Sequence, residues 1–195
     1  MAERLFIAVE TSAEARQRLG ALQKAVPCAG VQIKWVRPEN IHLTLAFLGD
    51  TEAAMAEQVK ALMDEAAAAA SPFAFDVIGA GYFGSRREPR VVWAGLTGDL
   101  TPLKKMQTRL SNGLKALGIP LDERDFKPHL TIGRIKGVIH AGAFVTEIEK
   151  RGGEVFGRVQ SDHIVLMRSV LAPEGPTYTP VHVSPLGTGG HDDKT

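Results

Sequence analysis

A histidine and a threonine two residues apart occur twice in the chain, each time within the tripeptide His-Leu-Thr. The first copy is His42-Leu43-Thr44 and the second is His129-Leu130-Thr131. Each copy lies in a short apolar run, which predicts a strand, and alternation along a strand puts its histidine and threonine on one face, about 6.6 Å apart. One copy alone would be typical of a structural histidine. Two copies indicate two similar lobes facing each other across a cleft with convergent polar groups.

Two imidazoles and two hydroxyls in one cleft suit displacement at phosphorus. Near neutral pH a neutral imidazole can take a proton from the attacking oxygen while a protonated one gives a proton to the leaving oxygen. Threonine hydroxyls can donate hydrogen bonds to anionic oxygens. This chemistry requires no metal and no other cofactor. A Ser/His/Asp triad fits less well, because neither copy offers a nucleophile with a carboxylate orienter, and two histidines fall short of the usual zinc ligand set.

The overall composition restricts the class of protein and the size of its partners. The chain has 195 residues, of which 44% are hydrophobic, and 23 Lys and Arg against 22 Asp and Glu give a formal charge of +1. This balance argues against a protein that follows long stretches of duplex by neutralising many phosphates. A nucleic acid would therefore be held only locally. The single cysteine, Cys28, excludes an internal disulfide. With no apolar run long enough for a membrane span or a secretory signal, we expect a soluble cytoplasmic protein that does not bind membranes.

Apolar periodicity and helix caps predict an α+β fold built on antiparallel sheets. One domain is expected over residues 1–186, followed by a disordered tail at 187–195 that has no apolar face to bury. The first helix should begin at a cap on Thr11 or Ser12 and end before Pro27. Further helices are predicted at 51–70, 101–118 and 141–151. The helix at 101–118 should be capped by Asp99 or Thr101. Strands are predicted at 4–10, 31–36, 41–48, 73–78, 91–96, 129–135, 153–159, 163–171 and 177–183.

The segment 79–90 is predicted to be a functional loop. It contains three glycines, two aromatic residues and three arginines, which is more than a simple connector needs. Tyr82 and Phe83 are candidates for stacking on a base, since exposed aromatic faces serve single-stranded nucleotides. The alternative is that the two rings only anchor the loop. The arginines, expected to contact the phosphates of the terminal nucleotides, are Arg86, Arg87 and Arg90.

Several segments together resemble the two-histidine (2H) phosphoesterases. They are RLFIAVE, KWVRPENIHLTLAFLG, VVWAGL and ERDFKPHLTIGR, and the resemblance extends over residues 3–183. It is most specific for the bacterial and archaeal RNA 2′,3′-cyclic phosphodiesterases, once called 2′-5′ RNA ligases. The resemblance implies two pseudo-symmetric lobes of antiparallel sheet with outer helices and an active-site cleft between them.

The resemblance also implies a role for each motif residue. His42 would protonate the leaving 3′ oxygen, and His129 would act as the base on water, leaving a 2′-phosphate. Thr44 and Thr131 would hold the non-bridging oxygens. Arg134 would add a cation near the phosphate, unless it is only a solvated strand-end arginine. The implied partner is an RNA 3′ end or a small nucleotide that bears a 2′,3′-cyclic phosphate, bound by a monomer.

Two other functions stay open on the sequence. The cleft could bind RNA ends or a nucleotide without catalysis, with the threonines and the arginine as an anion cradle. The same site could also join RNA ends through a 2′-5′ bond, which reverses one step of the cleavage chemistry.

Overall fold

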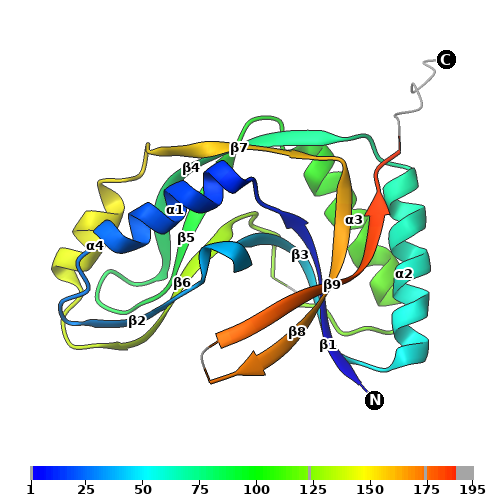
Figure 1. Ribbon diagram of the computed structural model, residues 1–195, viewed down its shortest axis with the longest axis horizontal. Coiled ribbons are helices and arrows are strands. Elements are labelled where there is room, and N and C mark those ends of the chain that lie inside the picture. The colour runs from blue at the N-terminus through cyan, green and yellow to red at the C-terminus, as the bar shows by residue number, and fades with distance from the viewer. Residues whose placement is uncertain (1, 123, 174, 188–195) are drawn as a thin grey trace.

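An antiparallel sheet runs through the whole molecule, with helices packed around it (Figure 1). The computed structural model describes residues 2–122, 124–173 and 175–187. Within these residues the α+β class predicted from the sequence is confirmed. The strands are β1 (Glu3–Glu10), β2 (Val31–Trp35), β3 (His42–Thr51), β4 (Phe73–Gly84), β5 (Pro89–Thr97), β6 (Leu130–Val138), β7 (Val155–Ser161), β8 (His163–Ala172) and β9 (Gly175–Pro185). The helices are α1 (Ala13–Ala25), α2 (Ala53–Ala68), α3 (Thr101–Ala116) and α4 (Gly142–Glu149), with a 3-10 turn at Pro38–Asn40.

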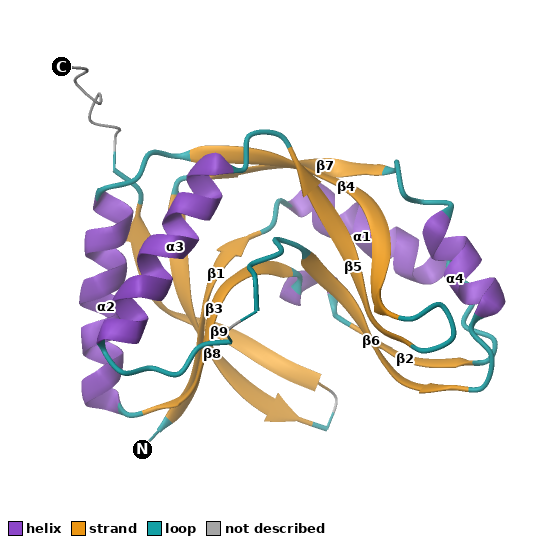
Figure 2. Cartoon of the chain, turned by 180° about the vertical axis from the view of Figure 1, so that it is seen from behind, coloured by secondary structure: helices purple, strands orange, loops and turns teal. Residues whose placement is uncertain are grey.

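The sheet consists of two lobes that meet between β3 and β6. The strand order is β7-β4-β5-β6-β3-β1-β8-β9, and β2 pairs with the other part of β6. One lobe therefore holds β3, β1, β8 and β9, and the other holds β6, β5, β4, β7 and β2. Helices α2 and α3 lie side by side on the first lobe, and α1 and α4 lie on the second (Figure 2). The first His-Leu-Thr copy thus begins the innermost strand of one lobe, and the second begins with His129 directly before β6, the innermost strand of the other.

The two lobes do not correspond to the two halves of the sequence. Helix α1 follows β1 of the first lobe but packs on β7 of the second. Helix α3 follows β5 of the second lobe but packs beside α2 and β3 of the first. Because the chain crosses repeatedly between the lobes, the apolar residues of both form one main core cluster.

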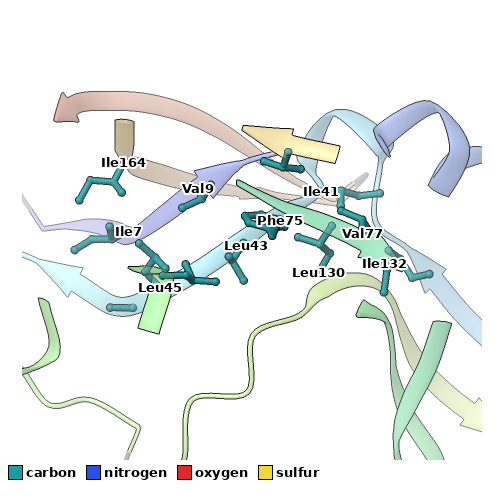
Figure 3. Packing of buried hydrophobic residues seen from close by; sticks show 14 of the residues in the cluster. Ile7, Val9, Ile41, Leu43, Leu45, Phe75, Val77, Leu130, Ile132 and Ile164 are labelled. Carbon is teal, nitrogen blue, oxygen red and sulfur yellow. The ribbon is translucent and has the colours of Figure 1, made fainter. Parts of the chain in front are cut away.

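The junction between the lobes is a pair of leucines, one from each His-Leu-Thr copy. Leu43 of β3 is the register partner of Leu130 of β6. Both side chains are buried, at 1% and 0% exposure, and Figure 3 shows them within the core near Phe75. Since neighbouring residues of a strand point to opposite faces, burial of the two leucines turns the histidines and threonines toward the other face.

The segment 79–90, predicted to be a loop, is mostly strand. Strand β4 continues to Gly84 and β5 begins at Pro89, so only residues 85–88 form the turn. Pairing continues because Gly81 lets the Trp93 ring lie against the backbone: a Cβ on Gly81 would come within 2.4 Å of that ring. Tyr82 and Phe83 are therefore consecutive strand residues, and their side chains point to opposite faces.

The predicted helix caps are partly confirmed. Ser12 accepts a hydrogen bond from the Ala15 N–H at 3.2 Å, as expected for the cap of α1. Asp99 accepts one from the Thr101 N–H at 2.9 Å before α3. The prediction that Thr51 opens the next helix is wrong, because Thr51 is the buried last residue of β3. In the described segments, no helix is long and apolar enough to cross a membrane. The predicted tail 187–195 lies, except for Gly187, outside the described residues.

Removing the leucine at the junction tests how strongly the lobes depend on it. We expect Leu130→Ala to lower the free energy of unfolding by about 2–5 kcal/mol, because truncating a buried leucine leaves a cavity. Leu171→Ala is the matched control, since Leu171 is 67% exposed on β8 and its truncation should change stability by no more than about 0.5 kcal/mol. Chemical denaturation of both variants measures the difference. Equal stabilities would contradict the structural importance of the junction.

Candidate active site

The two motif strands share an irregularity directly after the His-Leu-Thr copies. On β3, Thr44 pairs with Ala8 of β1, and the next pair is Ala46 with Ile7, so Leu45 is an extra residue without a partner. On β6, Thr131 pairs with Trp93 of β5, and the next pair is Gly133 with Val92, so the extra residue is Ile132. Each is a β-bulge, which places two consecutive residues on the core side and reverses the alternation beyond it.

The bulges bring the third residue after each threonine back to the face of the histidines. On β6 this residue is Arg134 and on β3 it is Phe47, and both line the cleft. In a regular strand a residue three places after a threonine would point to the opposite face. The bulge on β6 is therefore what brings Arg134 beside His129 and Thr131.

The bulge on β6 is held by a buried amide and a glycine. Gln23 of α1, only 8% exposed, donates from Nε2 to the carbonyl oxygens of Ile132, at 2.9 Å, and Val36, at 2.7 Å. The Val36 N–H also donates to the Ile132 carbonyl at 2.9 Å. Gly133 is required by packing, since a Cβ there would lie 2.8 Å from the Trp35 ring. A bulged residue is left out of the regular strand pairing, so its carbonyl needs other partners. The Ile132 carbonyl thus accepts two hydrogen bonds, from the Gln23 amide and from the Val36 N–H.

Both histidines are held in the same tautomer by the carbonyl two residues before them. Nδ1 of His42 lies 2.7 Å from the Asn40 oxygen, and Nδ1 of His129 lies 2.7 Å from the Lys127 oxygen. A carbonyl can only accept, so each Nδ1 carries the proton and donates it. Nε2 of each neutral ring is then the basic nitrogen. Nε2 of His42 lies 3.1 Å from the Thr44 hydroxyl, within hydrogen-bond distance.

Aromatic rings surround the two histidines differently. The His42 ring stacks on Phe6 with centroids 4.7 Å apart and meets the edge of Tyr178 at 5.2 Å. The His129 ring meets Phe83 edge to face at 4.9 Å. His42 is therefore enclosed on two sides, while His129 has one aromatic neighbour among the described residues and lines the open cleft.

Burial lowers the pKa of both His42 and His129 below the ordinary 6.5. In each case the Nδ1 hydrogen bond to a carbonyl opposes this effect, and the positive charge of Arg134 adds to it. Burial raises the pKa of the Tyr178 hydroxyl, and the same Arg134 charge works against that rise. One guanidinium therefore acts on both imidazoles, and both rings are mostly neutral at pH 7.

The cleft between the lobes has a volume of about 910 Å³, enough for a nucleotide. It contains the side chains of Thr44, His129, Thr131 and Arg134, and it extends to α3 and to the segment 121–127. Among the described residues, no three His, Cys, Asp or Glu side chains are grouped so that they could hold a metal ion.

The structure divides the candidates of segment 79–90 between the cleft and the outer surface. Phe83 lines the cleft next to His129, whereas the Tyr82 hydroxyl donates to Glu149 on α4 at 3.1 Å, outside the cleft lining. Arg86 is also directed to α4, where it pairs with Glu149 and donates to Thr146 at 3.0 Å. Arg90 lines the cleft, and Arg87 lines a separate hollow near the end of β6.

Sequence reasoning missed several residues that shape this site. One of them is Phe47, which an alignment of the two motif copies places at the position of Arg134. Gln23 had only a weak signal, as a polar residue between the apolar positions of a helix. Phe6 and Tyr178 have no signal in the sequence, because they reach His42 from β1 and β9, which are far apart in the chain.

Known proteins resemble this chain over nearly its whole length. A sequence model of the family described as "LigT like Phosphoesterase" matches residues 9–93 and 99–178. The RNA 2′,3′-cyclic phosphodiesterase of Aquifex aeolicus is 35% identical over 188 residues, which are 94% of this chain and 97% of that protein. The protein of the same name from Methanothermobacter thermautotrophicus is 32% identical over 183 residues, covering 94% and 98%.

Solved structures agree with these matches. A Thermus thermophilus crystal structure aligns with a TM-score of 0.78 and 31% identity over 96% of this chain and 100% of that one. Escherichia coli LigT, crystallised with 3′-AMP, aligns with a TM-score of 0.78 and 26% identity over 95% of this chain and 99% of that one. With its paired His-Leu-Thr strands around one cleft, the chain belongs to the LigT-like phosphoesterases, the two-histidine family that its sequence resembles.

Proposed function

We propose that this protein is an RNA 2′,3′-cyclic 3′-phosphodiesterase, which hydrolyses the cyclic phosphate of an RNA 3′ end or a nucleotide to a 2′-phosphate. The observation that carries the proposal is the pair of imidazoles whose Nδ1 protons are fixed by carbonyls, both under the influence of one arginine. The names of the relatives, RNA 2′,3′-cyclic phosphodiesterases, support the same activity.

In the proposed reaction each histidine moves one proton. Nε2 of His129 takes a proton from water, and the water oxygen forms a bond to phosphorus. The bond between phosphorus and the 3′ oxygen breaks, and the protonated Nε2 of His42 gives its proton to that oxygen. The product is a 2′-phosphate with a free 3′ hydroxyl. The open position of His129 supports its role as the base for water, which leaves His42, whose Nε2 lies 3.1 Å from the Thr44 hydroxyl, as the acid.

The neighbours of the histidines are proposed to bind the phosphate itself. Thr44 and Thr131 would donate to its non-bridging oxygens, which gain negative charge as the attacking oxygen bonds. Arg134 would add a full positive charge close to the same oxygens. Since side chains serve both proton transfers and the charge, the proposed mechanism has no step that requires a metal.

We also propose that the protein acts as a monomer in the cytoplasm, as one domain over residues 1–186. One chain supplies both motif copies and the cleft between them, and one core cluster joins the lobes. These features support a site that is complete without a second copy.

Removal of either motif histidine tests the catalytic assignment. We expect His42→Ala and His129→Ala each to lower the turnover of a 2′,3′-cyclic nucleotide by at least about 100-fold, because each loses one proton-transfer group. His182→Ala is the control: this histidine bonds Asp64 at 2.7 Å, away from the cleft, and should keep normal turnover. Phosphorus NMR of the product provides the measurement. Substrate that binds to the unmodified protein without forming product would instead support a non-catalytic binding module.

The lowered pKa values predict the direction of the pH dependence. At pH 7 both rings are mostly neutral, so the active form with one protonated ring becomes more abundant as the pH falls. We therefore expect kcat/KM to rise from pH 8 to a maximum below 6.5, then to fall when the base is protonated as well. Activity should survive EDTA. A profile that rises steadily with pH, or activity lost to the chelator, would contradict the mechanism.

Arg134 allows the electrostatic part of the mechanism to be tested separately. Its charge lowers both histidine pKa values, so Arg134→Gln should raise both and move both limbs of the pH profile to higher pH. The same variant should lose about tenfold or more in kcat/KM, because a charged hydrogen bond to the phosphate is lost. Arg134→Lys keeps the charge and should leave the limbs in place. Identical pH profiles for all three proteins would show that Arg134 lies in the solvent and not at the phosphate.

A further inference from the structure

Arg90 is turned into the cleft by a third β-bulge, in the hairpin of β4 and β5. Phe83 pairs with Val91, and the next pair is Gly84 with Pro89, so Arg90 is an extra residue of β5. In a regular strand consecutive residues point to opposite faces, yet Arg90 and Val91 both line the cleft. Gly84, whose φ is +108°, permits the bend beside this bulge. The hairpin is therefore shaped so that a cation faces the cleft.

The charge of Arg90 is not used by the fold. Nearby arginines are paired with carboxylates: Arg86 with Glu149 on α4, and Arg124, which also lines the cleft, with Asp122. Within the described part of the chain, Arg90 has no such carboxylate partner, and its side chain is exposed. The guanidinium is thus available to a ligand in the cleft.

The cleft as a whole carries more positive charge than one cyclic phosphate needs. Its charged side chains are four cations, Arg90, Arg124, Lys127 and Arg134, and two carboxylates, Asp122 and Asp125. The cyclic phosphate of a nucleoside carries a single negative charge, which Arg134 is proposed to meet. A ligand with a second anionic group would complement this lining better.

The sheet places Arg90 just beyond Arg134 on the way out of the cleft. Pairing of β5 with β6 runs outward from Ala94 with Leu130, at the junction of the lobes, to Val91 with Arg134. Arg90 is the next residue of β5, beside the turn of the hairpin (Figure 2). Because neighbouring strands lie about 4.8 Å apart, the two guanidinium groups can serve consecutive positions along one chain.

We propose that Arg90 binds the phosphate that joins the terminal nucleotide of an RNA to the preceding one. Its planar guanidinium would donate two parallel hydrogen bonds to the non-bridging oxygens of that phosphate. The substrate is then an RNA 3′ end of at least two nucleotides. This inference rests on the proposed function, because it extends the same substrate by one phosphate. Of the three arginines in segment 79–90, the role falls to Arg90, since Arg86 is bound to α4 and Arg87 lines a separate hollow.

The decisive experiment compares substrates with and without the second phosphate. They are adenosine 2′,3′-cyclic phosphate and the dinucleotide ApA with a 2′,3′-cyclic phosphate end. We expect Arg90→Gln to raise KM for the dinucleotide about tenfold, because a charged hydrogen bond to phosphate is lost. Its kcat and the KM of the mononucleotide should stay nearly unchanged. Arg90→Lys keeps the charge and should lose less than the glutamine variant.

Arg86→Gln is the matched control. It removes the same charge from the same hairpin, but Arg86 points to Glu149 outside the cleft, so both KM values should remain as they are. Salt gives a second readout. The preference of the unmodified protein for the dinucleotide should decrease as the KCl concentration rises, and this dependence should be flatter in Arg90→Gln.

Two results would overturn the subsite. They are an equal KM for both substrates in the unmodified protein, and an equal loss for both in Arg90→Gln, which would place Arg90 at the cyclic phosphate. Adenosine 5′-phosphate 2′,3′-cyclic phosphate distinguishes RNA from a free nucleotide. An Arg90 effect confined to this compound would assign the site to a terminal phosphate and overturn the RNA assignment.

Binding of the products separates this inference from the proposed function. Calorimetry compares adenosine 2′-phosphate with ApA 2′-phosphate on the unmodified protein and on Arg90→Gln. We expect the dinucleotide to bind more tightly, and Arg90→Gln to remove most of that difference. If the protein turns over neither cyclic phosphate, the proposed function fails, while the binding comparison still decides on Arg90.

Discussion

The geometry of the whole cleft depends on the burial of two leucines at one strand contact. Leu43 and Leu130 pair across the lobes and are almost completely excluded from solvent. Burial of each side chain is worth about 1.5–3 kcal/mol, and a slip of one residue on either strand would exchange leucine for a polar neighbour in the core. The facing of the histidines and threonines is therefore determined by hydrophobic packing, and the polar groups need not attract one another to converge.

The bulges add what regular strands cannot provide. A strand can place residues two apart on one face, but a cation three residues after the threonine requires a break in the alternation. On β6 the chain meets this requirement with Gly133, which fits against Trp35, and with the Gln23 amide, which satisfies the displaced carbonyl. A residue on helix α1, remote in sequence from the motif, thus helps to direct Arg134.

The sequence predicted the elements that local patterns determine. Both motif strands, the four helices and the antiparallel class follow from apolar periodicity and caps such as Ser12, and the structure agrees. It could not predict that α1 and α3 change lobes, because periodicity identifies an apolar face but not the surface that covers it. The glycines of segment 79–90 predict a loop, whereas Gly81 allows the Trp93 ring to pack on a strand. Tyr178 and Phe6 reach His42 only through tertiary folding.

The asymmetry of the side chains matches the asymmetry of the proposed reaction. Two similar lobes would treat the attacking and leaving oxygens alike, but one oxygen comes from water and the other belongs to the ribose. His129 lies in the open cleft, where water can approach, while the His42 ring packs against Phe6 and Tyr178. The same division recurs one step outward, where Arg134 of β6 and Phe47 of β3 occupy equivalent positions, so the two strands present different side chains to the cleft on a similar backbone.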